Sequence, residues 1–184
     1  MLRGDELFVD TVKHAIQATW PGGIQKECIL VSGTENVHEV KLHGTPWNDC
    51  DGEQNFRCNQ MMIRLLGELG GVGYKLICGT NLKGTMDSFF FFKEESYRVG
   101  ASDFCILSLN NGDLIRLIDC NDMIESVENA INKSEYKIQR ISSEYGGIEF
   151  KLKGCPWNCS GVPAIESRRL LCRISEELLA QVAQ

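Results

Sequence analysis

The side chains best suited to chemistry in this chain are its thiols and its histidines. There are nine cysteines and three histidines, at positions 14, 38 and 43. A catalytic thiol needs a base within hydrogen-bond reach. A Cys50 or Cys58 thiolate beside His43 would meet this need, but nothing in the spacing selects that pair. We therefore predict no catalytic residue, and a thiol-dependent enzyme ranks third among the candidate functions.

The same residue types raise the question of a metal site. Cys155 and Cys159 form a C-x3-C pair, and His43 lies near Cys50 and Cys58 in the first half of the chain. Structural zinc needs four such ligands in tetrahedral geometry. The two groups do not occupy equivalent positions in the repeat described next, and C-x3-C is not the usual zinc-knuckle spacing. We predict no metal site and no cofactor.

The strongest pattern is a repeated Pro-Trp motif. Residues 39–48 (EVKLHGTPWN) return as residues 149–158 (EFKLKGCPWN), and Lys151 minus Lys41 gives a period of 110 residues. Proline fixes the backbone angle φ, and the adjacent indole is a large, flat anchor. The motif therefore predicts either a recognition tip with two equivalent tryptophans or a plug between each strand and the helix that follows.

Arginines accompany both motifs on the helices expected after them. Arginine and tryptophan are enriched together at protein interfaces. The leading hypothesis is a non-catalytic protein-binding or scaffold module that engages a protein partner or a second copy of itself. Its predicted contact residues are Trp47, Trp157, Pro46, Pro156, Arg64 and Arg173.

Four consecutive phenylalanines, Phe89, Phe90, Phe91 and Phe92, break the alternation expected of a strand with one wet face. A central strand covered on both faces explains the run most simply. A ligand pocket or a dimer contact is the alternative. The second candidate function is thus a binder of a small molecule or lipid-like ligand, with the phenylalanine-rich sheet as a cup closed by helices.

Periodicity and turn residues predict the elements that position these side chains. Asn111-Gly112 is a strong signal for a tight hairpin, and Pro, Gly, Asn and Asp predict a loop over residues 46–59. The expected order is αββαββββαββα. Helices are predicted over 6–19, 61–69, 122–133 and 164–180, and strands over 28–32, 37–42, 74–78, 88–93, 104–109, 114–118, 137–141 and 148–152.

This order predicts an α+β fold, mainly antiparallel sheet with helices on one face. The chain is expected to hold one complete repeat (5–118) and one partial repeat (119–184) of the 110-residue unit. We predict one pseudo-symmetric domain over 1–184, because half a unit rarely buries enough surface alone. Residues 94–103 should then join strands of one sheet. The alternative is that the partial repeat leaves a sheet edge or helix face for a partner.

Composition narrows the class of protein. The chain of 184 residues is 43% hydrophobic and carries a net charge of −6 with scattered basic residues, which argues against nucleic-acid binding. No window approaches the roughly 20 apolar residues of a membrane span. An odd number of cysteines without a secretory leader indicates free thiols in a reducing compartment, so we expect an intracellular protein of the cytosol with access to the nucleus.

The chain resembles an uncharacterised eukaryotic repeat family. The shared pattern is Trp-Pro-x-Gly-Ile-Gln, then Lys-Leu-x-Gly-x-Pro-Trp, then Arg-Leu-Leu, then Asp-x-Phe-Phe, here at 20–25, 151–157, 169–171 and 87–90. The second copy departs from it, with Ser134-Glu135-Tyr136 in place of Trp20-Pro21. The resemblance implies a repeat architecture over nearly the whole chain and no activity.

Overall fold

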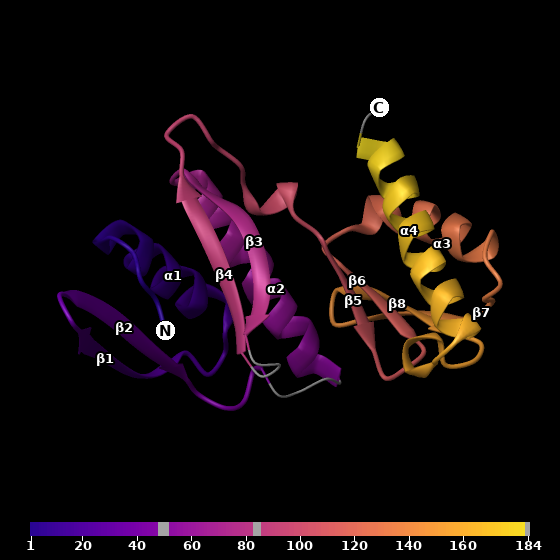
Figure 1. Cartoon of the computed structure of the whole chain (residues 1–184), viewed down its shortest axis with the longest axis horizontal. Coiled ribbons are helices and arrows are strands. Elements are labelled where there is room, and N and C mark those ends of the chain that lie inside the picture. The colour runs from indigo at the N-terminus through magenta and orange to yellow at the C-terminus, as the bar shows by residue number, and fades with distance from the viewer. Residues whose placement is uncertain (48–51, 83–85, 183–184) are drawn as a thin grey trace. The chain divides into compact units, whose positions relative to one another are not determined.

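A computed structural model describes residues 1–47, 52–82 and 86–182 (Figure 1). Its helices are α1 (Glu6–Thr19), α2 (Gly52–Gly71), α3 (Ile124–Asn132) and α4 (Val162–Val182). Its strands are β1 (Ile24–Ser32), β2 (Glu35–Leu42), β3 (Tyr74–Leu82), β4 (Met86–Lys93), β5 (Ile106–Asn110), β6 (Leu114–Ile118), β7 (Ile138–Glu144) and β8 (Gly147–Leu152).

The predicted class and order are confirmed. Every strand pair in the described residues is antiparallel, and helices and strands alternate as αββαββββαββα. The predicted Asn-Gly hairpin joins β5 to β6, where Asn111 and Gly112 both have positive φ. Such angles match the twist of the two flanking strands, which is why this dipeptide closes tight hairpins.

The predicted loop over 46–59 is wrong in its second half, because α2 already begins at Gly52. Gly52 has a φ of 67° and turns the chain into the helix. Phe56 then buries its ring almost completely in the first turns. The polar residues of this stretch suggested a loop, but one buried aromatic side chain is enough to anchor a helix start.

The four strands between residues 74 and 118 do not form one sheet, contrary to expectation. In the described residues β3 pairs with β4 in a two-stranded sheet, and β1 with β2 in another. The hairpin β5–β6 instead joins β7–β8 in a four-stranded sheet of order β5-β6-β8-β7. The partner that β6 selects is therefore β8, more than thirty residues downstream.

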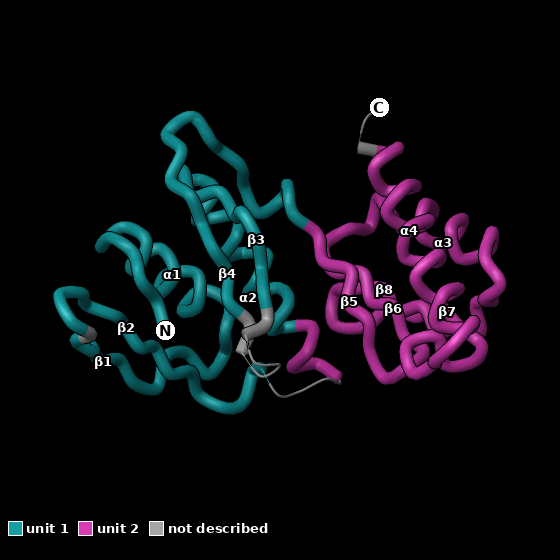
Figure 2. Tube along the Cα trace, in the orientation of Figure 1, with its two compact units in different colours: residues 1–48, 57–104 teal, residues 49–56, 105–184 magenta. Residues whose placement is uncertain are grey.

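The chain divides into two compact units (Figure 2). Unit 1 comprises residues 1–48 and 57–104, and unit 2 comprises residues 49–56 and 105–184. One boundary between the two units lies between residues 104 and 105, directly after the segment 94–103. The single pseudo-symmetric domain over 1–184 stays a prediction.

Unit 1 has a core built from α1, α2 and both hairpins. Asp5 caps α1 by accepting a hydrogen bond from the Phe8 amide at 2.9 Å. The Phe8 ring packs edge-on against Tyr74 of β3 and Phe91 of β4, with centroids 5.0 and 5.5 Å apart. The buried members of this core are Phe8, Val12, Ile16, Trp20, Leu42, Met61, Leu69 and Tyr74.

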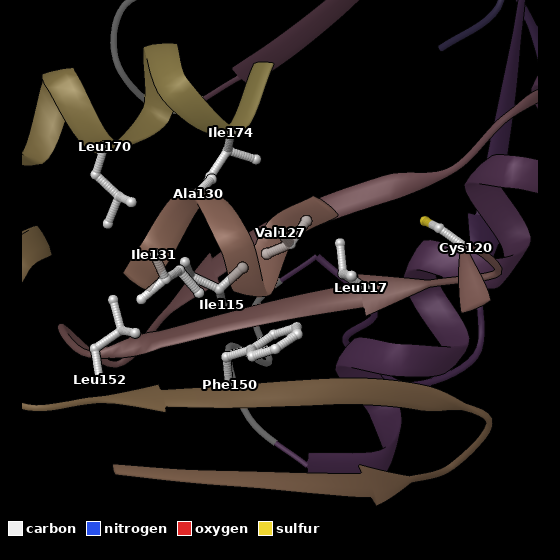
Figure 3. Packing of buried hydrophobic residues seen from close by; sticks show 10 residues of the cluster. All are labelled: Ile115, Leu117, Cys120, Val127, Ala130, Ile131, Phe150, Leu152, Leu170 and Ile174. Carbon is white, nitrogen blue, oxygen red and sulfur yellow. The ribbon is translucent and has the colours of Figure 1, made fainter. Parts of the chain in front are cut away.

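Unit 2 packs α3 and α4 against one face of its four-stranded sheet (Figure 3). Apolar side chains of β6 and β8 meet the inward stripes of the two helices there. Ten buried residues form this core: Ile115, Leu117, Cys120, Val127, Ala130, Ile131, Phe150, Leu152, Leu170 and Ile174. The stripe Val127, Ala130 and Ile131 of α3 matches Val12, Ala15 and Ile16 of α1, and both stripes are buried.

Candidate partner-binding site

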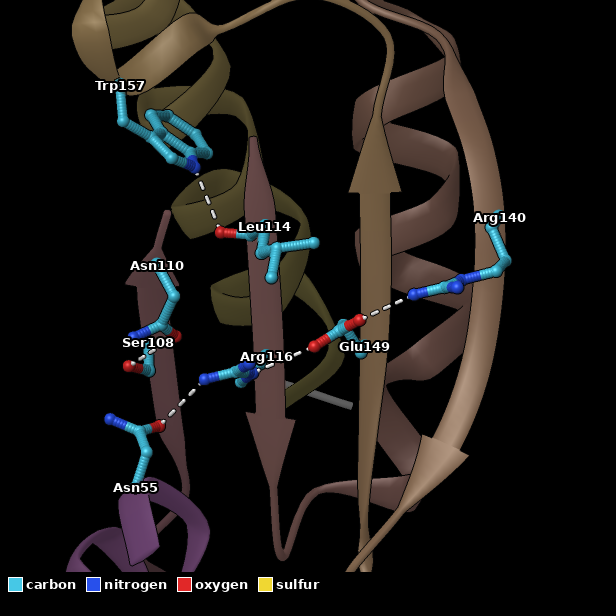
Figure 4. A network of polar contacts seen from close by, with 8 residues as sticks. All are labelled: Asn55, Ser108, Asn110, Leu114, Arg116, Arg140, Glu149 and Trp157. Carbon is cyan, nitrogen blue, oxygen red and sulfur yellow. Dashed lines mark hydrogen bonds and ion pairs between the residues drawn. The ribbon is translucent and has the colours of Figure 1, made fainter. Parts of the chain in front are cut away.

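The second Pro-Trp loop is packed into its own unit. Pro156 is buried and Trp157 is half-buried against the core of unit 2. The indole N–H of Trp157 donates a hydrogen bond to the Leu114 carbonyl of β6 at 2.9 Å (Figure 4). The Trp157 backbone N–H donates to the Gly112 carbonyl at 3.0 Å. This tryptophan therefore holds the start of β6, which fits the plug interpretation.

The first Pro-Trp loop has a different environment. Pro46 is buried like its counterpart, but Trp47 has 64% of its surface exposed. Tryptophan is one of the largest apolar side chains and is highly buried on average in folded proteins. The two predicted contact tryptophans are thus equivalent in sequence and different in structure.

The strands that lead into the two loops are superimposable in register. β2 pairs with β1 as Ile24 with Leu42 and Lys26 with Lys41, and a bulge lies between the two pairs. β8 pairs with β7 as Ile138 with Leu152 and Arg140 with Lys151, with the bulge at the same place. The His43 amide bonds to Gly23 as the Lys153 amide bonds to Lys137. The repeat therefore extends to individual backbone hydrogen bonds.

The two strands differ at their second edge. β8 pairs along its whole length with β6, from Gly147 to Lys151. On the corresponding edge of β2, the structure of the described residues has one isolated bridge, in which Leu2 and His38 exchange both backbone hydrogen bonds at 2.7 and 2.9 Å. Within the described residues, no strand corresponding to β6 pairs with this edge of β2, and Trp47 is exposed.

Side chains repeat the same contrast. Glu149 of β8 is buried and accepts bonds from Arg116 of β6 at 3.0 Å and from Arg140 of β7 at 3.1 Å (Figure 4). Its counterpart Glu39 is only partly buried, and it accepts a hydrogen bond from the Cys28 thiol at 3.1 Å. Burial of a carboxylate requires a cation in contact. Arg116 of β6 and Arg140 of β7 both supply such a cation to Glu149.

The predicted contact arginines lie on the helices and bind groups of their own unit. Arg64 forms an ion pair with Glu68 one turn along α2 at 2.5 Å, and Glu68 also contacts His14 of α1 at 2.8 Å. Burial raises the pKa of Glu68, but the bonds from His14 and Arg64 outweigh this and leave it lowered. Arg173 of α4 donates to the Lys133 carbonyl at the end of α3. Arg173 therefore links α4 to the end of α3, whereas Arg64 pairs within α2 with the glutamate that contacts α1.

The phenylalanine run is not a central strand. β4 pairs only with β3 in the described residues. Phe91 enters the core, whereas Phe90 and Phe92 point outward with 51% and 60% of their surface exposed. Phe89 is also about half exposed. The expectation that both faces are covered is wrong, because the predicted sheet ends at this hairpin.

Other apolar side chains share this exposure and were not predicted. Ile77, at the bulge of β3, lies beside the outward phenylalanines, and three consecutive residues of β1 are exposed as well: Ile29, Leu30 and Val31. A continuous apolar run reads as a buried strand. No pattern within a strand reveals whether another layer covers it.

We compared the chain with models of known protein families and with known proteins. Residues 1–93 and 103–181 match the model of one domain family. The chain belongs to this family. The unmatched segment 94–102 lies between β4 and β5, just before the chain passes from unit 1 to unit 2. No curated protein and no solved structure matches the chain. Membership supports the repeat and transfers no activity.

The ligand-binding and thiol-enzyme alternatives have less support in the structure. A shallow depression in unit 1 lies between α1 and α2, and none of the four phenylalanines lines it. Its lining residues are Asp10, Thr11, His14, Glu68, Gly71 and Val72. Cys50, one of the two thiols considered beside His43, falls outside the described residues. Burial raises the pKa of the other, Cys58, to about 11, which disfavours its thiolate.

One thiol pair stands apart from the predicted sites. Cys105 and Cys120 flank the open end of the hairpin β5–β6, and their side chains are in contact. The interaction with the Cys120 thiol lowers the pKa of the exposed Cys105 to about 7 and raises the pKa of the buried Cys120, whose thiol also donates a hydrogen bond to the Ile118 carbonyl at 3.0 Å. The Sγ of Cys105 also lies 3.9 Å from the Sδ of Met123. Fourteen residues separate these cysteines, so no spacing motif indicated them.

No helix in the described part of the chain is long and apolar enough to cross a membrane. Within the same residues, no three His, Cys, Asp or Glu side chains gather into a group that could hold a metal ion.

Proposed function

We propose that this chain is a non-catalytic protein-binding module and that Trp47 anchors its binding site. The observation that carries the proposal is the contrast between the two Pro-Trp loops. Trp157 has its strand in place, and Trp47 exposes 64% of its surface beside a strand edge with one described bridge. Exposed tryptophans held by a rigid backbone are typical anchors of protein interfaces.

The surroundings of Trp47 support a protein as the ligand. Pro46 is buried and restricts the backbone beside the exposed indole. The outward face of the hairpin β3–β4, with Ile77, Phe90 and Phe92, adds a second apolar surface in the same unit. A scaffold that contacts more than one partner would use both surfaces.

The compartment proposed for this activity is the cytosol, with access to the nucleus. All eight cysteines in the described residues are free thiols. Free thiols persist in reducing compartments. The net charge of −6 favours a protein partner over a nucleic acid.

The test is capture of partners from cell extract on the immobilised chain. Trp47→Ala is compared with wild type and with Leu179→Ala, which removes a similarly exposed apolar side chain from α4. We expect a set of proteins to be lost with Trp47→Ala alone, with circular dichroism identical for all three. An unchanged set of captured proteins in Trp47→Ala would contradict the proposal. Trp157→Ala is unsuitable here, because the loss of its packing would disturb the fold.

A further inference from the structure

In unit 2, β6 pairs with the edge of β8 that corresponds to the second edge of β2. β6 runs antiparallel to β8, and the pairs Leu114–Lys151, Ile115–Phe150 and Arg116–Glu149 form its first rungs. The Leu152 amide donates to the Asp113 carbonyl at 2.8 Å. Because alternate residues of a strand face the same edge, the backbone groups of residues 148, 150 and 152 face β6.

Three side chains of the β8 repeat bind β6 in addition to the backbone. Glu149 bonds with Arg116 at 3.0 Å, and Lys151 with the Asp113 carboxylate at 2.5 Å. The Trp157 indole donates to the carbonyl of Leu114. The acid and the arginine of β6 are three residues apart, and two apolar residues separate them.

The edge of β2 carries the same three side chains with the same spacing. Glu39, Lys41 and Trp47 occupy the positions of Glu149, Lys151 and Trp157. The bridge to Leu2 shows that His38 faces this edge, so the backbone groups of Val40 and Leu42 face it too. The stretch from Glu39 to Trp47 therefore has backbone groups facing this edge and carries an acid, a lysine and a tryptophan at the repeat positions of the residues that hold β6.

The geometry points to a strand-binding site: the β2 edge from Glu39 to Trp47 takes up an extended partner segment, antiparallel to β2, with the pattern Gly-acid-apolar-apolar-Arg. This inference rests on the proposed function and names the chemistry of its partner. The arginine would lie opposite Glu39 and the acid beside Lys41. The first carbonyls of the segment would accept bonds from the Trp47 loop.

Charge and length define this partner. Glu39 and Lys41 lie on one face of β2, so a segment with its charges reversed would place like charges in contact. The Leu2 bridge at His38 limits the free stretch to about five residues of partner, since one partner residue pairs with each residue of β2. The strand β6 of this chain has the pattern, but β5 and β8 already pair with all five of its residues. β6 is therefore not available, and the proposed occupant is a segment of another protein.

The experiment uses the β6 sequence itself as the probe. A fluorescein-labelled peptide Asn-Gly-Asp-Leu-Ile-Arg-Leu, the sequence of residues 111–117, is titrated with the full chain and followed by fluorescence anisotropy. We expect saturable binding that Glu39→Gln and Trp47→Ala each weaken by about tenfold, the usual size of one charged hydrogen bond or one interface aromatic. Glu27→Gln, on β1 of the same hairpin, is the matched control and should bind as wild type does.

A charge swap tests the register. The peptide with Glu in place of its Arg should lose binding to wild type and regain it with Glu39→Arg. Absence of binding to wild type would overturn the inference, and so would binding that ignores both Glu39→Gln and Trp47→Ala. The capture experiment with Trp47→Ala does not use this peptide. A failed titration with a successful capture would therefore remove the strand-binding site and leave the proposed function.

Discussion

Trp47 and Trp157 occupy equivalent positions in the repeated motif, but their environments differ because a residue distant in sequence contacts only Trp157. The Leu114 carbonyl, 43 residues before Trp157, is what makes that indole structural. Trp47 has the same proline and the same preceding strand, and it remains exposed. A repeated motif therefore identifies equivalent backbone, and the function of its side chains depends on the strand beside them.

Truncating the two tryptophans should have unequal effects on stability. Trp157→Ala removes core contacts and a hydrogen bond, and we expect the free energy of unfolding to fall by about 3 kcal/mol. Trp47→Ala should change it by less than about 0.5 kcal/mol, as for other exposed residues. Urea unfolding followed by circular dichroism measures both. Equal losses would mean that Trp47 is packed as Trp157 is.

Cys105 should be the thiol that reacts early at neutral pH. Its pKa is about 7 because of its interaction with the Cys120 thiol, so about half is thiolate at pH 7. Alkylation by iodoacetamide, followed at each site by mass spectrometry, should accelerate up to about pH 8 and then level off. Cys120→Ala removes this interaction, and the pKa of Cys105 should then rise towards its ordinary value.

In that variant the rate at Cys105 should fall about fivefold at pH 7, because a thiolate of higher pKa is scarcer but more nucleophilic. Cys172, exposed on α4, is the internal reference. A rate at Cys105 that does not respond to Cys120→Ala would show that the contact between the two thiols is not the cause.

At the scale of elements, the start of α1 is linked to the hairpin β3–β4 through Asp5. Its carboxylate accepts bonds from the Tyr74 hydroxyl and the Phe8 amide, and Lys93 of β4 lies 3.2 Å away. These contacts, the Tyr74 bond first, lower the pKa of Asp5 to about 2. The N-terminus of a helix and two strands are thus joined by one side chain.

The pH dependence of stability follows from this. The unfolded chain takes up a proton at Asp5 near pH 4 and the folded chain only near pH 2. The contribution of Asp5 is therefore present above pH 4 and is lost as the pH falls from 4 to 2. Asp5→Asn keeps a cap but cannot titrate, so its melting temperature should fall less steeply in this window. Asp10→Asn, on the same helix, is the control, and an equal flattening there would refute the assignment.

The two strand edges should differ in hydrogen exchange. The amides of Phe150 and Leu152 face β6, whereas those of Val40 and Leu42 face the edge that has only the Leu2 bridge. Unpaired strand amides exchange faster than paired ones. We expect exchange at Val40 and Leu42 to be at least about tenfold faster, as measured by NMR. Similar protection at all four amides would show that another strand covers β2.

Much of this element scale could be predicted from the sequence. Apolar periodicity located α1, and Asn111-Gly112 located the tight hairpin. Three features could not be predicted, because each depends on a contact between distant segments. They are the start of α2 at Gly52 with Phe56 buried, the pairing of β6 with β8, and the exposed outward face of β4. The same limit applies to the candidate site: Trp47 was predicted as a contact, but its difference from Trp157 was not.

At the scale of the whole chain, the sequence repeat and the compact units do not coincide. The repeat assigns β5 and β6 to the first copy, whereas unit 2 begins at Cys105 and includes both strands. Each unit then holds two hairpins and two helices, in opposite order along the chain. The second unit completes its sheet by using a hairpin that precedes its own helices.

Unit 2 also includes a residue from far upstream. Phe56, in α2, lies against Gly147 where a Cβ would stand, and the Arg116 guanidinium lies 5.3 Å from the centre of its ring. Phe56→Ala should lower the free energy of unfolding by about 3–4 kcal/mol, as for other buried aromatic residues. Thermal unfolding of the full chain tests this, with exposed Phe92→Ala as the control. Comparable melting temperatures for the two variants would contradict it.

Because Phe56 belongs to unit 2 but lies far upstream in the sequence, it restricts where the chain can be truncated or recombined. A genetic exchange that moved residues 105–184 as one cassette would leave behind the ring that covers the face of Arg116. The recipient chain would gain a sheet with an uncovered charged pair. Recombination should therefore preserve the two copies together, and truncation at the boundary between the units should yield a product that aggregates.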